Sequence, residues 1–204
     1  MKAVITADIV NSSQLDKASE RLLLNILKKV LMPYKYEFYR GDSFQVYVED
    51  AAASFALVLK LRSSARQFRQ PITYFDIKAS IGIGEVMKPV RDISQAKGEA
   101  FLLSGRSFDE RIVNDRRLTI NCGKEPFDTA FSIISSFTDY LFEQLTSGQA
   151  IILSELLSGH TQQAIAKRMK KSQPTISGQA RASGYPQLKE LLSNFDYLIK
   201  TIPS

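Results

Sequence analysis

Stretches with strand periodicity alternate with stretches of helical periodicity between residues 2 and 121, and this alternation limits the fold more than any other feature of the chain. The run KAVITADIV at residues 2–10 is apolar and β-branched, which predicts a buried central strand. Residues 14–31 place leucine, isoleucine and valine at the i, i+3, i+4 and i+7 spacing of a core-facing helix, and Ser13 is expected to cap it. A strand followed by a helix is therefore expected in this part of the chain.

The next segments repeat both patterns. Alternating apolar residues between 36 and 48 predict two strands joined by a turn at residues 40–43. Helical periodicity follows at residues 49–68, and strand alternation returns at residues 74–86. This β-α-β-β-α-β order is that of the ferredoxin-like split βαβ sandwich, in which two helices cover one face of an antiparallel sheet. We therefore predict an α+β fold of this type.

Further elements extend this unit, and then the pattern changes. A helix at residues 98–113 and a strand at residues 118–121 are expected to enlarge the sandwich, so that the α+β domain covers residues 1–125. Residues 126–146 are interpreted as a linking helix. Only helical patterns occur from residue 147 to residue 204, which predicts an all-α C-terminal domain.

The segment Thr161–Arg181 has the pattern of a helix-turn-helix, with five basic residues and no acidic one. Ser172 is placed to cap its second helix, and Pro174 is tolerated in the first turn because the amide that proline lacks has no partner there. The small Ala166 would lie where two short helices cross. The apolar residues spaced for this packing are Ile165, Ala166, Met169 and Ile176.

The polar side chains of this segment predict a surface that binds double-stranded DNA. Those of the second helix can donate or accept hydrogen bonds at base edges in a groove. The alternative is a helical hairpin that packs on the rest of the protein and exposes a solvated basic face. The expected DNA-binding residues are Lys167, Arg168, Lys170, Lys171, Ser172, Gln173, Thr175, Ser177, Gln179 and Arg181.

This segment resembles the helix-turn-helix of sigma-factor-type and response-regulator-type transcription proteins, in which Q-x-x-I-A is followed by a hydrophobe, a turn and x-I-S. Lys170 stands where such motifs usually carry glycine. The turn is therefore expected to accept a left-handed residue or to adopt a different conformation. The resemblance implies a role in transcription regulation.

The distribution of charge supports a polyanionic partner for the C-terminal part. The 204 residues carry a net charge of +6. Residues 1–146 contain 20 basic and 18 acidic residues, whereas residues 147–204 contain 7 basic and 3 acidic ones. The basic excess lies mainly in the shorter part, as expected for a segment that contacts nucleic acid.

Composition also excludes several kinds of chemistry. Cys122 is the only cysteine and His160 the only histidine, so an intramolecular disulfide, a Cys/His zinc cluster and a triad of the serine or cysteine type are not expected. The segment MKAVITADIV turns polar at Asp8, so no leader is expected, and no run approaches the roughly 18 apolar residues of a membrane span. We therefore expect a cytoplasmic protein.

Four short motifs in the first part of the chain occur in the order in which class III nucleotide cyclases carry similar ones. They are ADIVNSS at residues 7–13, YRGDSFQVYV at residues 39–48, IKASIGIGEV at residues 77–86 and GEAFLLSGR at residues 98–106. Residues 1–120 therefore resemble a class III nucleotide cyclase domain, and the fold that this implies is a ferredoxin-like, cyclase-like βαββαβ sandwich.

Two aspartates in these motifs are candidate metal ligands. Asp8 at the end of the first strand and Asp42 at the hairpin tip are expected to lie side by side, and converging carboxylates can hold Mg²⁺ or Mn²⁺. The resemblance implies that the carbonyl of Ile9 is a third ligand, that the helix starting near Ser13 binds a triphosphate, and that Arg106 contacts phosphate. The alternative makes Asp8 a helix cap and Asp42 a turn residue.

The chain also departs from the cyclase pattern. Leu102 stands where the cyclases have an asparagine, and Phe38 stands where they have the lysine that selects a purine. Loss of one transition-state contact typically lowers a rate by about 10²–10³. With two such contacts missing, we expect no efficient cyclisation.

The combination of both parts resembles the SatD-type bacterial proteins. The leading hypothesis is a DNA-binding transcription regulator with a degenerate cyclase-like domain that senses a nucleotide or dimerises. A homodimer would read half-sites about 34 Å apart. The first alternative is an active metal-dependent nucleotidyl cyclase or nucleotidyltransferase gated by the tail, and the second is a protein-interaction module.

Overall fold

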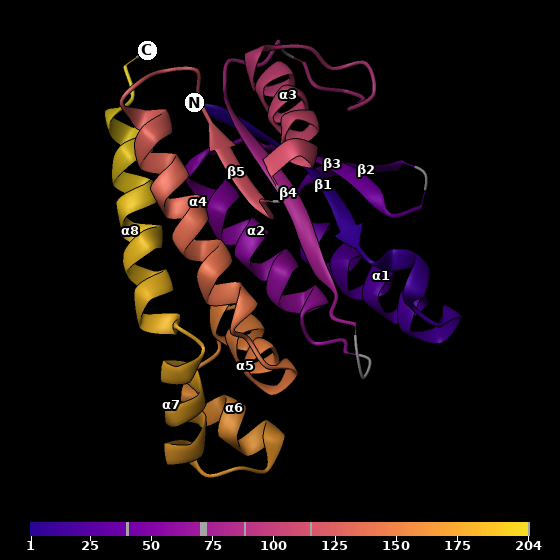
Figure 1. The fold of residues 1–204 in the computed structure, drawn as a ribbon, viewed down its shortest axis with the longest axis vertical. Helices are drawn as coiled ribbons and strands as arrows, with labels where there is room; N and C mark the ends of the chain where they lie inside the picture. The colour runs from indigo at the N-terminus through magenta and orange to yellow at the C-terminus, as the bar shows by residue number, and fades with distance from the viewer. Residues whose placement is uncertain (40, 70–72, 88, 115, 204) are drawn as a thin grey trace.

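A five-stranded sheet forms the centre of the structure, a computed structural model that describes residues 1–204 except 40, 70–72, 88, 115 and 204 (Figure 1). Of residues 110–114 it describes the backbone alone. Arg40, part of the predicted turn, lies outside the described residues. The strand order is β2-β3-β1-β4-β5, antiparallel except for the β4–β5 pair. The strands are β1 (Lys2–Val10), β2 (Lys35–Tyr39), β3 (Ser43–Val48), β4 (Asp76–Gly84) and β5 (Leu118–Asn121).

Helices cover both faces of this sheet: the two that were predicted to share one face do so, and a third covers the other face. α1 (Lys17–Leu31) and α2 (Ala52–Ala65) lie on the face to which the odd-numbered residues of β1 point. α3 (Glu99–Asn114) covers the opposite face, where the Thr6 hydroxyl donates to the Ser104 hydroxyl at 3.1 Å. A Cβ at Gly82 would lie only 2.2 Å from the carbonyl oxygen of Ala100, so α3 needs a glycine in β4 to come this close. The sheet is therefore a buried middle layer.

The first helix begins later than predicted. Residues Ser12–Gln14 form a single 3₁₀ turn, and α1 starts at Lys17. Its N-cap is Asp16, whose carboxylate accepts the N–H groups of Ala18 and Ser19 at 3.0 and 2.9 Å. The expectation that Ser13 caps the helix is therefore wrong, because an aspartate three residues on satisfies the free amides of the first turn instead.

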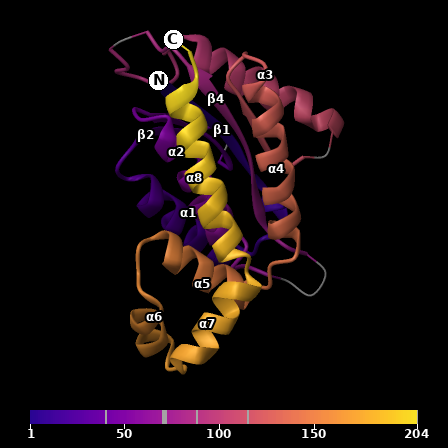
Figure 2. The same cartoon turned by 90° about the vertical axis from the view of Figure 1, so that its left-hand side faces the viewer.

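The C-terminal helices return to the core of the sheet. α8 runs back alongside α4 (Figure 2). The ring of Phe195 in α8 lies 5.2 Å from that of Phe55 in α2 and 5.5 Å from that of Phe131 in α4. One hydrophobic core therefore extends across the expected domain boundary at residue 146. The helices are α4 (Phe127–Glu143), α5 (Ser147–Leu157), α6 (Gln162–Met169), α7 (Gln173–Ala182) and α8 (Tyr185–Thr201).

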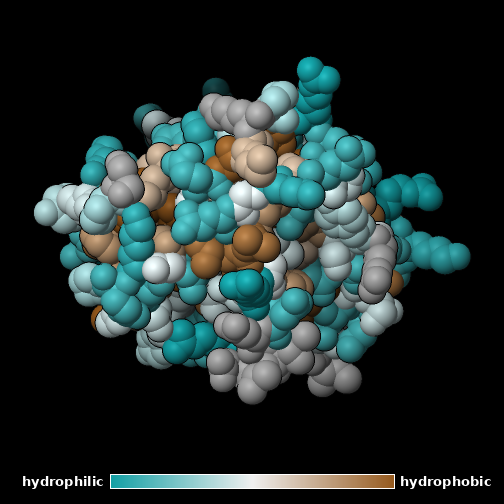
Figure 3. All heavy atoms as spheres, turned by 90° about the horizontal axis from the view of Figure 1, so that it is seen from above, coloured by the Kyte–Doolittle hydropathy of each residue, from teal (hydrophilic) through white to brown (hydrophobic). Residues whose placement is uncertain are grey.

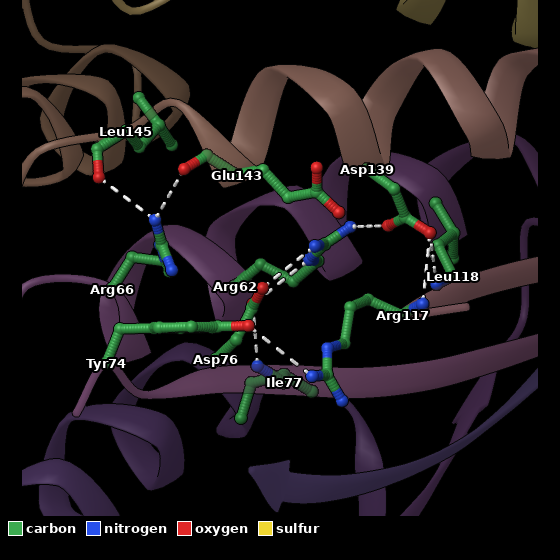
Figure 4. A network of polar contacts seen from close by, with 10 residues as sticks. All are labelled: Arg62, Arg66, Tyr74, Asp76, Ile77, Arg117, Leu118, Asp139, Glu143 and Leu145. Atoms are coloured by element: carbon green, nitrogen blue, oxygen red, sulfur yellow. Dashed lines mark hydrogen bonds and ion pairs between the residues drawn. The ribbon is translucent and has the colours of Figure 1, made fainter. Parts of the chain in front are cut away.

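A buried ion-pair network ties α4 to α2 and β4 (Figure 4). The guanidinium of Arg62, fully buried in α2, donates to both carboxylate oxygens of Asp76 at 3.1 and 2.8 Å. Its third bond, of 2.5 Å, goes to Asp139 in α4, and the ring of Phe142 lies 4.4 Å beneath it. Asp139 also accepts the main-chain N–H groups of Arg117 and Leu118. The network joins helix and sheet where α4 leads into α5.

The end of the molecule opposite α6 and α7 has a mostly hydrophilic surface (Figure 3). Seen from the end opposite α6 and α7, apolar side chains show only in small areas between hydrophilic ones (Figure 3). Among the described residues, none of the helices has the length and apolar character needed to cross a membrane.

Candidate functional site

The local structure of α6 and α7 follows from the capping residues of the segment. The hydroxyl of Thr161 accepts the N–H of Ala164, and that of Ser172 accepts the N–H of Thr175. Between the two helices Lys170 has φ 51° and ψ 43°, the left-handed conformation, which is one of the two outcomes expected for this turn. Two short helices joined by a tight turn are therefore present at the predicted place.

The apolar sides of these helices pack on α5. The buried cluster contains Ile165 and Ala166 of α6, and Ile176 and Ala180 of α7, with Met169 packed against it. Ile152 and Leu156 of α5 complete it. Burial of this side leaves the opposite side of α7 facing solvent.

The exposed side of α7 carries the polar residues of the predicted DNA surface. Gln173, Thr175, Ser177 and Arg181 are exposed, and Gln179 is half-buried. The exposed basic residues Lys167, Lys170 and Lys171 lie at the end of α6 and in the turn. α6 and α7 form one end of the molecule (Figure 1). The polar side of α7 is therefore accessible to a large partner.

One of the predicted DNA-binding residues forms an ion pair within the protein. The guanidinium of Arg168 in α6 forms an ion pair with the carboxylate of Glu155 in α5. The Nδ1 atom of His160 lies 2.8 Å from the same carboxylate. The charge of Arg168 is thus partly neutralised. Most of the positive charge of the segment Thr161–Arg181 therefore comes from its other basic residues.

The structure brings together Asp8 and Asp42, two of the predicted metal ligands, and places the main chain of Ile9 beside them. Asp8 pairs with Ser43 in the β1–β3 register, and the Ser43 hydroxyl donates to its carboxylate at 2.8 Å. The Ser12 hydroxyl donates to the Asp42 carboxylate at 2.6 Å, and the Ile9 N–H donates to the Asp42 carbonyl at 3.3 Å. The two hydroxyls, which sequence reasoning missed, hold the carboxylates in place. Ser43 directly follows Asp42 in GDS, and Ser12 belongs to the same motif ADIVNSS as Asp8, which is the signal that could have identified them.

Burial raises the pKa of Asp8 above its ordinary value. The hydrogen bond from Ser43 lowers this pKa, the nearby Asp42 carboxylate raises it, and the Lys78 ammonium lowers it. The net direction is upward, so the ionised carboxylate is disfavoured relative to the unfolded chain. A cation bound beside Asp8 and Asp42 would offset this cost.

Replacing Asp8 by asparagine is expected to raise Tm at pH 7, because asparagine avoids the cost of a partly buried charge. Because the folded pKa of Asp8 lies above the unfolded one, ionisation costs stability as pH rises through the folded value. The gain should therefore shrink toward zero as the pH falls through the unfolded pKa of about 3.9, because well below this value the carboxyl is protonated in both states. Thermal unfolding between pH 3.5 and 8 tests this, with the exposed Glu190→Gln as control; equal gains at both pH limits would contradict it.

Other predicted features lie apart from this pair. Arg106 is exposed on α3, and within the described part of the chain no contact links it to Asp8 or Asp42. The N-terminus of α1, expected to bind a triphosphate, is occupied by the carboxylate of Asp16. Triphosphate binding at this helix therefore stays a prediction.

The two departures from the cyclase pattern have different surroundings. The ring of Phe38 packs 5.0 Å from that of Phe44, on the face of the sheet opposite Asp8. Leu102 is exposed on α3.

Burial raises the pKa of the Cys122 thiol to about 12, which rules out a thiolate nucleophile at neutral pH. No group of three or more His, Cys, Asp or Glu side chains gathers among the described residues.

The sequence matches no protein-family model and no curated protein. Among solved structures, the active GGEEF domain of a diguanylate cyclase from Vibrio cholerae is similar at 16% identity, with a TM-score of 0.41 over 61% of this chain and 83% of that one. A bacterial light-regulated adenylyl cyclase is similar at 15% identity, with a TM-score of 0.40 over 58% of this chain and 74% of that one.

Proposed function

We propose that this protein is a DNA-binding transcription regulator in which α7 enters a groove of the double helix. The observation that carries the proposal is the two-sided character of α7. Its apolar side is buried against α5 and α6, and its exposed side carries Gln173, Thr175, Ser177 and Arg181. No acidic residue occurs in α6 or α7. Such side chains can reach base edges while the neighbouring lysines contact phosphates.

The proposal gives the sheet part a binding role rather than an enzymatic one. Asp8, Asp42 and the carbonyl of Ile9 are hard oxygen donors, which fit Mg²⁺ or Mn²⁺ together with a nucleotide. Phe38 is half-buried and packs against Phe44, and its apolar ring offers no hydrogen bond with which to select a base. Leu102 supplies no hydrogen bond to a transition state. These residues support sensing over efficient cyclisation.

The proposal also includes a homodimer. A single small module makes few phosphate and base contacts, so affinity at physiological salt favours two modules that read adjacent half-sites. Sedimentation of the full chain with a duplex that contains both half-sites is expected to give two protein chains per duplex.

The decisive experiment measures DNA binding by the full chain. A 1–146 fragment is unsuitable, because removing α8 would expose Phe55 and Phe131 of the core. The chain is titrated with a duplex from the region upstream of its own gene and with a shuffled duplex, between 50 and 300 mM salt. We expect tighter binding to the first duplex, with affinity that falls steeply with salt.

Variants locate the interface. Lys170→Ala combined with Lys171→Ala should weaken binding to both duplexes and reduce the salt slope by about 1.8, since each phosphate contact contributes about 0.9. Lys17→Ala combined with Lys29→Ala removes the same charge from exposed positions of α1 and should leave binding unchanged. Absence of salt-dependent binding to either duplex would overturn the proposal and favour a protein partner.

A further inference from the structure

A cavity of about 350 Å³ lies where the sheet part meets the start of α5. One wall comes from the end of α2 and the segment before β4, with Arg66, Arg69 and Tyr74. The other wall comes from the α4–α5 connection, with Thr146 and Ser147. This volume is at the lower end of the range for small-molecule sites.

Arg66 is the unusual residue of this cavity. It is buried, with 7% of its surface exposed, and its Nε atom has no hydrogen-bond partner. Its Nη2 donates to the main-chain carbonyls of Glu143 and Leu145 at 3.3 and 3.0 Å, and the guanidinium carbon lies 4.6 Å from the centre of the Tyr74 ring (Figure 4). Unlike Arg62, Arg66 forms no ion pair with a carboxylate within the described part of the chain.

A buried guanidinium without a counter-ion is costly. Burial lowers the pKa of Arg66, which the charge of Asp76 only partly opposes. The exposed Arg69 adds a second positive charge to the wall, and Glu143 is the acidic residue that lines the cavity. The positive end of the eleven-residue α5 also faces this space, because α5 begins at Ser147.

We propose that this cavity binds the phosphate group of a small molecule. Guanidinium groups pair well with phosphate oxygens. Thr146 and Ser147 line the same cavity, and their hydroxyls offer further donors to a tetrahedral anion. The site is separate from Asp8 and Asp42, and the inference does not depend on DNA binding.

The proposal is tested by thermal unfolding of the full chain in sodium phosphate, with sodium acetate and sodium chloride at equal ionic strength. Phosphate at ten times its Kd should raise Tm by about 3–6 °C in a saturable manner, and the other anions should not. Glycerol 3-phosphate distinguishes the source: tighter binding than that of phosphate indicates a phosphate ester, and weaker binding indicates the free ion.

Two variants place the binding in this cavity. Ser147→Glu adds a carboxylate that the helix N-terminus tolerates, so the protein should fold and bind phosphate at least tenfold more weakly. Arg69→Gln should weaken binding about fivefold. The controls Ala18→Glu, in the first turn of α1, and Lys29→Gln change charge equally at exposed positions elsewhere. A shift that is absent, equal with acetate, or unchanged in both cavity variants would overturn the proposal.

Discussion

Replacing Asp139 by leucine is expected to lower the free energy of unfolding by about 3–5 kcal/mol, the usual cost of removing one partner from a buried ion pair. The change leaves the Nη1 atom of Arg62 without its acceptor at a fully buried position. It also removes the acceptor of the main-chain N–H groups of Arg117 and Leu118. For a chain of this size the corresponding fall in Tm is about 8–15 °C.

Denaturant unfolding measures this loss, and two further variants make it specific. Asp139→Asn keeps an oxygen acceptor of the same shape, so it should lose less than the leucine variant. Asp196→Ala breaks the exposed i,i+4 ion pair with Lys200 in α8 and should cost less than about 0.5 kcal/mol. Similar losses for Asp139→Leu and Asp196→Ala would show that the buried network contributes little.

This network illustrates what the sequence could not predict. Arg62 lies in an apolar stretch of α2, where an isolated cation signals a buried partner. Its partners are 14 and 77 residues away, and their identity depends on how α4 lies against the sheet. No local pattern contains that information. The position of α3 was missed for the same reason, since helical periodicity does not say which face of a sheet a helix covers.

Local chemistry was predictable wherever neighbouring residues decide the conformation. Ser172 caps α7 and Lys170 adopts the left-handed conformation, because the amides and carbonyls that they serve are within a few residues. The prediction that Ser13 caps the first helix failed for an equally local reason. Asp16 competes for the same role, and the structure uses the aspartate.

The candidate metal site was predictable from the topology of adjacent strands. A strand end and a hairpin tip meet when β1 pairs with β3, which places Asp8 beside Ser43 and next to Asp42. Arg106 was not predictable in this way, because its position relative to the pair depends on how the whole of α3 crosses the sheet. Motif order therefore located the carboxylates but not the guanidinium.

Replacing Ser177 by glutamate is expected to weaken DNA binding by at least about 30-fold, the largest functional effect of a single change. Ser177 is exposed in the middle of the polar side of α7. A base contact contributes about 1–3 kcal/mol, and a carboxylate at this position would also repel the phosphates. Anisotropy titration of the full chain measures the loss.

Folding should not be affected by this change. Glutamate is a good helix former, and Ser177 is exposed, so the longer side chain can extend into solvent. Ser136→Glu makes the same replacement at an exposed position of α4 and should bind DNA as the unchanged protein does. Ser177→Lys should keep or increase affinity for the shuffled duplex, since its added charge attracts phosphate. If Ser177→Glu and Ser136→Glu bind DNA equally well, α7 does not face the groove, and its polar side is more consistent with contact to another protein.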